Sequence, residues 1–345
     1  MTGFDSTKSS ILKEYQNYNP QLNLNQFITM VSIDNDEKAA ADLAKQFCLQ
    51  TESAIDMRIG MEYLYLNGFY TELDFLIIKN KQSENPINRK WGAVYELMVA
   101  RRNYNRPAQT ILHHAQEIKT SLPELKCLLI FLKISLDYSG YKYDSLGYYL
   151  DEINDLIMEV ENPLLASLFR VRLNTLLFIY YWKRNELILA RKHAYQAINQ
   201  TFNVERKVQL HINLALSYIY EDYHSSVYHL DEALKSAELF DKSQLISVIK
   251  NRNYPFICAH FGEVEGLKTK DLSEQAHIEI ARGNLKEAQR ILERVNQDTP
   301  FHKYYMGLAT GNEQFLFSSY NEFIEKRSDH FFARLPLQKI KRKAY

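Results

Sequence analysis

The chain has 345 residues and a formal net charge of zero, because 42 basic residues balance 42 acidic ones. A dedicated nucleic-acid-binding protein is usually basic, since the release of phosphate counterions drives most of its affinity, so this balance disfavours that class. The three cysteines are far apart and in no metal or redox spacing, which argues against a disulfide framework and for a reducing compartment.

The N-terminus, MTGFDSTKSSILKEY, does not have the basic and then apolar pattern of a secretory signal. Apolar runs such as 127–132 are far too short to cross a bilayer. We therefore expect a cytoplasmic protein.

Glycine and proline are scarce, at 11 and 8 residues, and no Val/Ile-rich strand pattern occurs. The chain is instead punctuated by turns of the Gly/Asn/Asp type, each between two apolar helical stretches and mostly about 35 residues apart. This period is typical of stacked helix hairpins. The turns lie at 67–68, 103–104, 140–141, 185–186, 222–223, 283–284 and 311–312. We expect an all-α, tetratricopeptide-like helix-hairpin solenoid, a right-handed superhelix, over 25–345, preceded by a short N-terminal segment, 1–24.

The first half of the array is less regular than the second. The apolar periodicity predicts helix pairs at 25–33 and 37–50, 53–66 and 69–78, 91–100 and 107–118, and 125–136 and 145–160. Pro107 is expected in the first turn of its helix, where its missing N–H is not needed.

From Asn185 onward, small and large apolar residues recur at spacings of three and four, as in Ala190, Ala194 and Ala197. The same offset follows the next turn at Ser226, Leu230 and Ala233. The long interval before Gly283 is predicted to contain one helix, 244–260, and then a loop, GEVEGLKTKD.

No motif in the sequence predicts catalysis. It has no His-Glu-x-x-His zinc site, phosphate-binding loop, dinucleotide fingerprint or nucleophile elbow. His113 and His114 are adjacent, so on a helix they diverge by about 100° and do not readily share a metal. We predict that the protein is not an enzyme and has no cofactor or metal.

Aromatic residues are abundant, with 24 Tyr and 18 Phe, and clusters at 178–182 and 218–220 fall on the first helices of their hairpins. One interpretation is that these rings fill the space between helical layers. The other is that they line a groove for an extended peptide. Asn174 and Asn213, also on first helices, would then supply amides that can both donate to and accept from a peptide bond.

The C-terminus, LPLQKIKRKAY, is strongly basic. It is interpreted as a solvated cationic end of the last helix, where positive charge suits the helix dipole. Contact with nucleic acid is the alternative.

Two segments resemble a known family. The sequence 217–223, SYIYEDY, with its following helix, is similar to a hairpin of the arbitrium receptors, AimR, of Bacillus phages. The sequence 328–336, SDHFFARLP, is similar to their closing motif, and Asn162-Pro163 and 24–49 fall in register. The resemblance covers roughly residues 10 to 340.

The resemblance implies a cytoplasmic, tetratricopeptide-like receptor for a short secreted phage peptide. Family members carry an N-terminal helix-turn-helix domain and bind an operator as homodimers. The free receptor activates transcription, and the peptide releases it and favours lysogeny. Only residues 9–18 match that domain here, as its last helix, so DNA binding is expected only with a complete helix-turn-helix.

The resemblance also assigns peptide-binding residues. Asp329 and Phe331 match positions that face the peptide. A groove asparagine of the family falls at Leu216 here, with Ser217 beside it.

Two further groove positions differ as well. A polar residue of the family falls at Ile179, and its groove arginine falls at Glu205, with Arg206 adjacent. An altered ligand is one reading of these changes. The alternative is a protein-interaction scaffold that no longer senses peptide or binds DNA, including as a partner of a related receptor.

Overall fold

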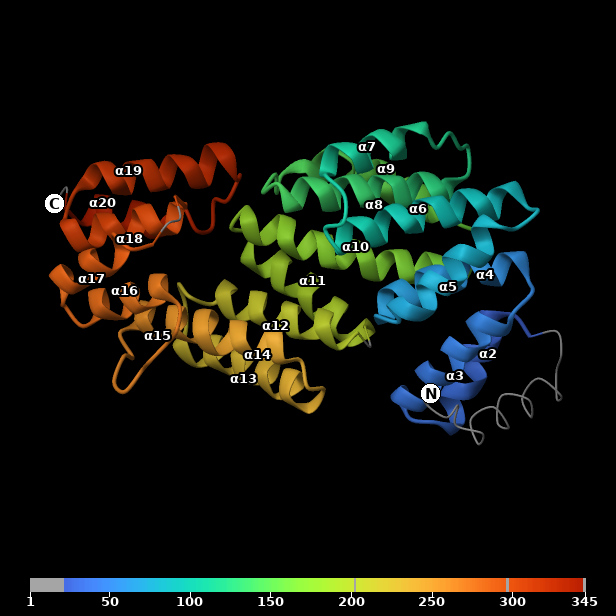
Figure 1. The fold of residues 1–345 in the computed structure, drawn as a ribbon, viewed down its shortest axis with the longest axis horizontal. Coiled ribbons are helices and arrows are strands. Elements are labelled where there is room, and N and C mark those ends of the chain that lie inside the picture. Colours follow the sequence, from blue (N-terminus) through green and yellow to red (C-terminus); the bar gives the residue numbers. More distant parts are fainter. Residues whose placement is uncertain (1–21, 202, 296–297, 344–345) are drawn as a thin grey trace. The chain divides into compact units, whose positions relative to one another are not determined.

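A computed structural model describes residues 22–201, 203–295 and 298–343, with side chains described to residue 341. Helices make up all of the regular structure in these ranges, which confirms the all-α prediction (Figure 1). Residues 1–21, which include most of the expected N-terminal segment, lie outside the described part.

The helices of the first half are listed here in chain order. They are α2 Leu24–Asp34, α3 Glu37–Gln50, α4 Ala54–Asn67, α5 Tyr70–Lys81, α6 Pro86–Arg102, α7 Ala108–Glu117, α8 Pro123–Ser139, η1 Ser145–Tyr148 and α9 Leu150–Glu159. The predicted pairs are present. However, the stretch predicted as one helix over 145–160 begins as a 3₁₀ turn, and Pro107 precedes its helix as the N-cap instead of lying inside the first turn.

The second half continues the pattern. Its helices are α10 Pro163–Lys183, α11 Leu187–Gln200, α12 Val204–Ser217, α13 Tyr223–Leu239, α14 Ser243–Val248, η2 Ile249–Asn253, α15 Tyr254–Phe261, α16 Leu272–Ala281, α17 Leu285–Leu292, α18 Pro300–Thr310, α19 Glu313–Asn321, η3 Glu322–Lys326 and α20 Arg334–Lys343. The segments η2 and η3 are π-helical. The long interval holds one helix, α14–η2–α15, followed by a loop, as predicted.

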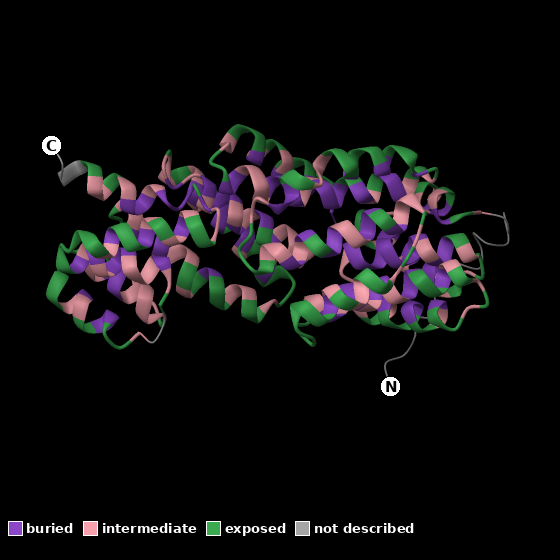
Figure 2. Ribbon diagram, turned by 90° about the horizontal axis from the view of Figure 1, so that it is seen from above, coloured by how far each residue is buried: buried purple, intermediate pink, exposed green. Residues whose placement is uncertain are grey.

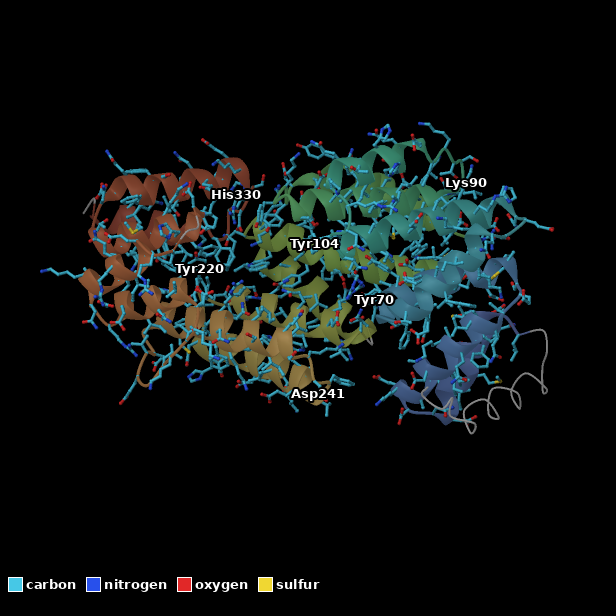
Figure 3. The ribbon with its side chains drawn as sticks, in the orientation of Figure 1. Tyr70, Lys90, Tyr104, Tyr220, Asp241 and His330 are labelled. Carbon is cyan, nitrogen blue, oxygen red and sulfur yellow. The ribbon has the colours of Figure 1, made fainter. Side chains whose placement is uncertain are left out.

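The recurring turns share one backbone device. A residue with positive φ follows the helix, and the next N–H donates to the carbonyl five residues earlier, which satisfies a carbonyl that the helix end leaves free. These bonds run from Phe69 to Leu64, Asn105 to Ala100, Lys142 to Asp137, Glu186 to Tyr181, Lys242 to Ala237, Glu263 to Cys258 and Asn284 to Glu279. Non-glycine residues hold the strained position at several of them, including Tyr104 and Asp241, both labelled in Figure 3.

Two of the predicted turns are built differently. Asp222 has an extended backbone and caps α13, since its carboxylate accepts from the N–H groups of His224 and Ser225. Gly311 ends α18, and its N–H donates to the carbonyl of Gly307, four residues earlier. The Gly/Asn/Asp turns of the sequence therefore mark both the ends and the starts of helices.

The described chain forms two compact units. The first contains the described residues up to Leu136, Tyr148–Leu173, Thr201 and Asn203; the second contains Asp137–Gly147, Asn174–Gln200 and the described residues from Val204 onward. The boundary falls within α8 and α10.

An ion pair lies in the core of the first unit. Arg172 donates to both carboxylate oxygens of Glu62, at 3.0 and 2.5 Å, and the Tyr95 hydroxyl donates to the same carboxylate. Glu62 and Tyr95 are fully buried. Buried charges of this kind are tolerated only when they are paired and hydrogen-bonded.

Small residues let helices of the second unit approach closely. The predicted ridges Ala190, Ala194 and Ala197, and Ser226, Leu230 and Ala233, are fully buried. Figure 2 shows buried and exposed stripes along individual helices, as expected for amphipathic helices packed in layers.

One described helix, α10, is long and apolar enough to cross a membrane by length and composition alone. Half of that stretch is buried within the protein, as a core helix would be, and it contains Arg172.

Candidate functional site

One face of α12 carries three of the candidate peptide-binding residues. Arg206, Asn213 and Ser217 are separated by seven and four residues, spacings that return to the same side of a helix. Arg206 and Asn213 are half-buried, whereas Ser217 is buried. The side-chain Oδ1 of Asn213 accepts from Nε2 of Gln209 at 3.1 Å.

Asn174 lies on α10 and is half-buried. Its Oδ1 is 2.9 Å from Nδ1 of His193 on α11, and the His193 ring stacks on Tyr181 with an interplanar angle of 9°. The Asn174 side chain is therefore held in place by the second helix of its own hairpin.

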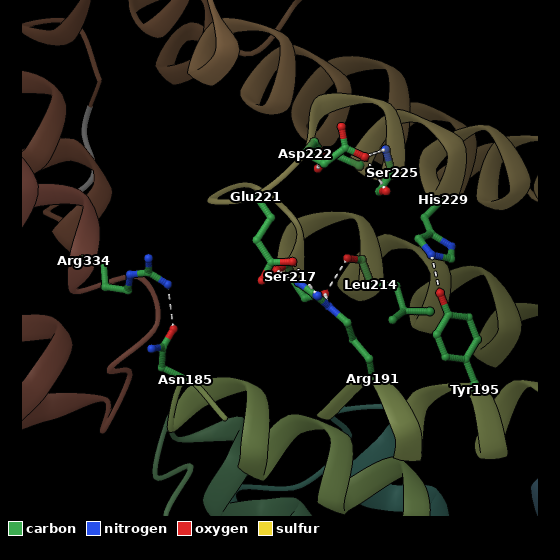
Figure 4. Close-up of polar contacts among 11 residues, drawn as sticks. Asn185, Arg191, Tyr195, Leu214, Ser217, Glu221, Asp222, Ser225, His229 and Arg334 are labelled. Carbon is green, nitrogen blue, oxygen red and sulfur yellow. Dashed lines mark hydrogen bonds and ion pairs between the residues drawn. The ribbon is translucent and has the colours of Figure 1, made fainter. Parts of the chain in front are cut away.

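Ser217 is the centre of a polar cluster at the end of α12 (Figure 4). Its hydroxyl donates to the carbonyl of Leu214 at 2.7 Å and accepts from Nε of Arg191 at 3.2 Å. Arg191 also donates to the Ser217 carbonyl, pairs with Glu221 at 2.7 Å and lies 3.6 Å from the ring centroid of Tyr218. The Ser217 hydroxyl is thus occupied by contacts within the chain.

Asp329 is buried in the turn that follows η3. Its Oδ2 accepts from Nζ of Lys183, the last residue of α10, at 2.8 Å, and its Oδ1 accepts from the N–H of Phe332 at 3.0 Å. Burial lowers the pKa of Lys183, although Asp329 opposes that effect. A ligand that reached Asp329 would have to share it with this ammonium group.

Phe331 is fully buried beside the same helix end. Its ring packs against Trp182 and Tyr220, its N–H donates to the Lys183 carbonyl at 3.2 Å, and its carbonyl accepts from the Tyr220 hydroxyl at 3.2 Å. Tyr220, labelled in Figure 3, follows α12 directly. The structure thus brings Asp329 and Phe331 to the C-terminal ends of the two helices that carry Asn174 and Asn213.

The two positions at which the chain departs from the family pattern, Ile179 and Leu216, are both half-buried on these same helices. Each therefore presents a partly accessible apolar surface.

Two histidines of the second unit lie close to each other, and one of them lies close to a tyrosine. Nδ1 of His211 is 3.1 Å from Nδ1 of His229, and Nε2 of His229 is 3.0 Å from the Tyr195 hydroxyl. Burial, followed by the charges of His211 and Arg191, lowers the pKa of His229 to about 4. His229 is therefore neutral near pH 7 and acts as a hydrogen-bonding core residue.

Sequence reasoning missed Lys183 and Arg191. Each stands beside a second basic residue, Arg184 or Lys192, which normally indicates a solvated helix face. Their partners are 146 and 30 residues away in the sequence. Only the fold shows that Lys183 pairs with the buried Asp329 and that Arg191 binds Ser217 and Glu221 at the end of α12.

The described residues contain no group of three or more His, Cys, Asp or Glu side chains placed to hold a metal ion. All three cysteines are buried, and burial raises the pKa of each thiol. A raised pKa disfavours the nucleophilic thiolate. The basic C-terminus continues as α20, whose side chains are described only to Lys341.

The chain matches known proteins over most of its length. It is 22% identical to the AimR transcriptional regulator of Bacillus phage SPbeta, over 92% of this chain and 85% of that protein. It is 24% identical to the AimR transcriptional regulator of Bacillus phage phi3T, over 83% and 77% of the two chains.

A solved structure of phAimR with a ligand has the same fold, with a TM-score of 0.76 and 19% identity over 94% of this chain and 98% of that one. The family model described as "AimR transcriptional regulator-like" matches residues 40–342. The chain therefore belongs to the AimR transcriptional regulator-like family.

Proposed function

We propose that this chain is a cytoplasmic, arbitrium-receptor-like sensor that binds a short peptide and thereby regulates the choice between phage lysis and lysogeny. Its membership of a family of transcriptional regulators supports the regulatory part. The convergence of Asp329 and Phe331 on the helix ends of α10 and α12 is the single observation that supports the peptide site most strongly.

In this proposal the peptide lies along Asn174, Arg206 and Asn213, and Ser217, Asp329 and Phe331 form the end of its site. The half-buried amides of Asn174 and Asn213 bond the peptide main chain. Ser217 acts through the backbone geometry of the α12 end, because its own hydroxyl is already bonded.

Titration calorimetry with hexapeptides encoded just downstream of the gene tests this function. We expect saturable binding by at least one of them, and a loss of about 10- to 100-fold in Asn213→Ala, because hydrogen bonds to a buried ligand amide are removed. Lys235→Ala on α13, whose side chain is 79% exposed, is the control and should bind normally. No heat with any peptide would overturn the proposal.

For the partners, we propose a homodimer or a complex with a related receptor, and contact with DNA through a complete helix-turn-helix if one is present. Gel-shift titration at low and moderate salt examines DNA binding. Binding that vanishes at moderate salt would be only electrostatic.

A second candidate is a helical-repeat scaffold that binds another folded protein and no longer senses peptide. Two observations favour this candidate. Asp329 is already paired with Lys183, and the apolar Ile179 and Leu216 offer no hydrogen bond, so fewer polar groups of the protein are available to bind a peptide. Copurification with full-length relatives, in the absence of any peptide binding, would support this candidate over the first.

A further inference from the structure

The two candidate asparagines, Asn174 and Asn213, each have their acceptor atom occupied within the chain. An asparagine side chain carries one acceptor, Oδ1, and one donor group, the NH2 at Nδ2. Oδ1 of Asn174 lies 2.9 Å from Nδ1 of His193, and Oδ1 of Asn213 accepts from Nε2 of Gln209 at 3.1 Å. The sequence led us to expect amides that both donate to and accept from a ligand, but in the structure only the donor half remains available.

The NH2 groups of the same two side chains are in the opposite situation. Neither Nδ2 atom has a hydrogen-bond partner among the residues that the structure describes, and neither is enclosed as a buried unpartnered atom. Asn174 and Asn213 are both half-buried, so these donors lie at the accessible edge of their side chains. A ligand that meets them would have to present hydrogen-bond acceptors.

The contact with Asn174 determines where the proton of His193 lies. Burial, followed by the charge of Lys192, lowers the pKa of His193, so the ring is neutral near pH 7 and carries one N–H. An amide oxygen can only accept, and the partner of the other ring nitrogen does not change that. The proton of His193 is therefore on Nδ1, and this N–H donates to Oδ1 of Asn174.

The His193 ring is also held against the helix that carries Asn174. It stacks on Tyr181, seven residues further along α10, with the ring centroids 5.6 Å apart and the planes 9° from parallel. Turning the Asn174 amide over would set its NH2 group against the Nδ1–H of this fixed ring. The amide therefore has one favourable orientation, with Oδ1 toward α11.

Asn213 has the same polarity but a weaker support. Its partner Gln209 is exposed and lies one turn earlier on the same helix, α12, and such pairs contribute little. The orientation of Asn213 is therefore less firmly set than that of Asn174, whose partner comes from a different helix.

We propose that His193 is a positioning residue, which holds the Asn174 amide so that its NH2 group faces the ligand, and that Asn174 and Asn213 bind carbonyl or carboxylate oxygens and no N–H groups. The inference rests on the proposed function and deepens it. An extended peptide presents carbonyl and N–H groups in alternation, and here the carbonyl groups would meet the two asparagines.

The first test needs no peptide. The full chain is labelled with ¹⁵N-histidine, and the ring nitrogens are observed by long-range ¹⁵N–¹H correlation NMR at pH 8, with the signals of His193 identified by their loss in His193→Phe. We expect the Nδ1–H tautomer in the unmodified chain and a shift toward Nε2–H in Asn174→Leu, which has no acceptor. Gln196→Leu, which removes the other side chain bonded to His193, is the matched control and should keep Nδ1–H.

An Nε2–H tautomer in the unmodified chain would overturn the positioning role of His193. A tautomer that is unchanged in Asn174→Leu and lost in Gln196→Leu would also overturn it, because Gln196 would then set the proton position.

The second test is titration calorimetry with the hexapeptides encoded downstream of the gene. His193→Phe keeps a ring to stack on Tyr181 but removes the donor, and should weaken binding about 3- to 10-fold. His193→Asn, whose Nδ2 can take the place of Nδ1, should restore most of the affinity. Asn174→Asp keeps the shape of the side chain but replaces the donor by an acceptor, and should weaken binding at least about 10-fold.

Asn321→Asp, at an exposed position at the end of α19, controls for the added negative charge and should bind normally. Normal binding by Asn174→Asp would overturn the inference, since the ligand would then not need the NH2 group. Equal binding by His193→Phe and the unmodified chain would show that His193 does not position Asn174.

The outcomes separate this inference from the proposed function. A chain that binds the hexapeptides while His193 has the Nε2–H tautomer retains the proposed function and loses the positioning role. A chain that binds none of them, with His193 in the Nδ1–H tautomer, loses the proposed function and the ligand-binding role of the two NH2 groups, and retains only the fixed orientation of Asn174.

Discussion

At the scale of single residues, two ion pairs are set apart from the exposed ones because both of their side chains are buried. Arg172 with Glu62 in the first unit and Lys183 with Asp329 in the second are the two pairs with almost no exposed side-chain surface. Removing one member of such a pair leaves the other as an uncompensated buried charge. These pairs therefore have large effects on stability that their sequence context does not reveal.

The variant Arg172→Met tests this for the first unit. We expect it to lower the free energy of unfolding by about 3 to 5 kcal/mol, because Glu62 would remain buried and unpaired. Arg170→Met, at an exposed position of the same helix, should change it by less than about 0.5 kcal/mol. Denaturant unfolding followed by circular dichroism measures both, and equal effects would show that the ion pair does not stabilise the fold.

Buried histidines make a second prediction at this scale, concerning acid stability. Burial lowers the pKa of His229 and of His260 to about 4, below the value of about 6.5 in an unfolded chain. Between these two values the unfolded chain binds more protons, so stability is complete above pH 6.5 and is lost as the pH falls toward 4.

The free energy of unfolding should therefore decline between pH 6.5 and 4. In His229→Gln the slope should be reduced, by at most about 1.4 kcal/mol per pH unit, since one proton no longer distinguishes the two states. His113→Gln, at a side chain that is 71% exposed, serves as the control. An unchanged slope in His229→Gln would show that this residue does not titrate with a lowered pKa.

At the scale of elements, the turns define the hairpins. Glycine, which has no Cβ, takes positive φ without strain at Gly68 and Gly283. Tyrosine holds the same kind of position at Tyr104 and Tyr141, with φ of 54° and 64°, and is strained there. A non-glycine residue in this region costs about 1 to 2 kcal/mol. The strained turns are therefore places where the protein can be stabilised.

Tyr104→Gly should raise the free energy of unfolding by up to about 1 kcal/mol, because relief of strain exceeds the added flexibility of the unfolded chain. Tyr104 is 83% exposed, so little packing is lost. Tyr148→Gly is the matched control, since Tyr148 is 79% exposed and has no positive φ, and it should be neutral or destabilising. If Tyr104→Gly destabilised the protein as much as the control, the strain argument would be wrong.

The sequence was sufficient to predict the helices and most of their turns, because apolar periodicity and turn residues are local signals. It also predicted the buried alanine ridge at Ala190, Ala194 and Ala197. It did not predict the π-helical turn that ends at Asn253, because the extra residue in such a turn has no characteristic amino-acid type. Nor could it show that Glu274 is half-buried, because an acidic residue in the first turn of a helix is normally solvated.

At the scale of the whole molecule, the described chain is a helical array in two compact units that belongs to a family of transcriptional regulators. All six candidate peptide-binding residues fall in the second unit. The first unit holds the Arg172–Glu62 pair and none of these six residues. We therefore propose that ligand recognition belongs to the second unit.

Hydrogen–deuterium exchange of the full chain, with and without the downstream-encoded hexapeptides, tests this assignment most directly. A bound peptide should slow exchange in α12, Val204–Ser217, and in the turn and helix ends around Asp329, while leaving α4 to α7 of the first unit unchanged. Absence of any protection, or protection confined to the first unit, would contradict the account.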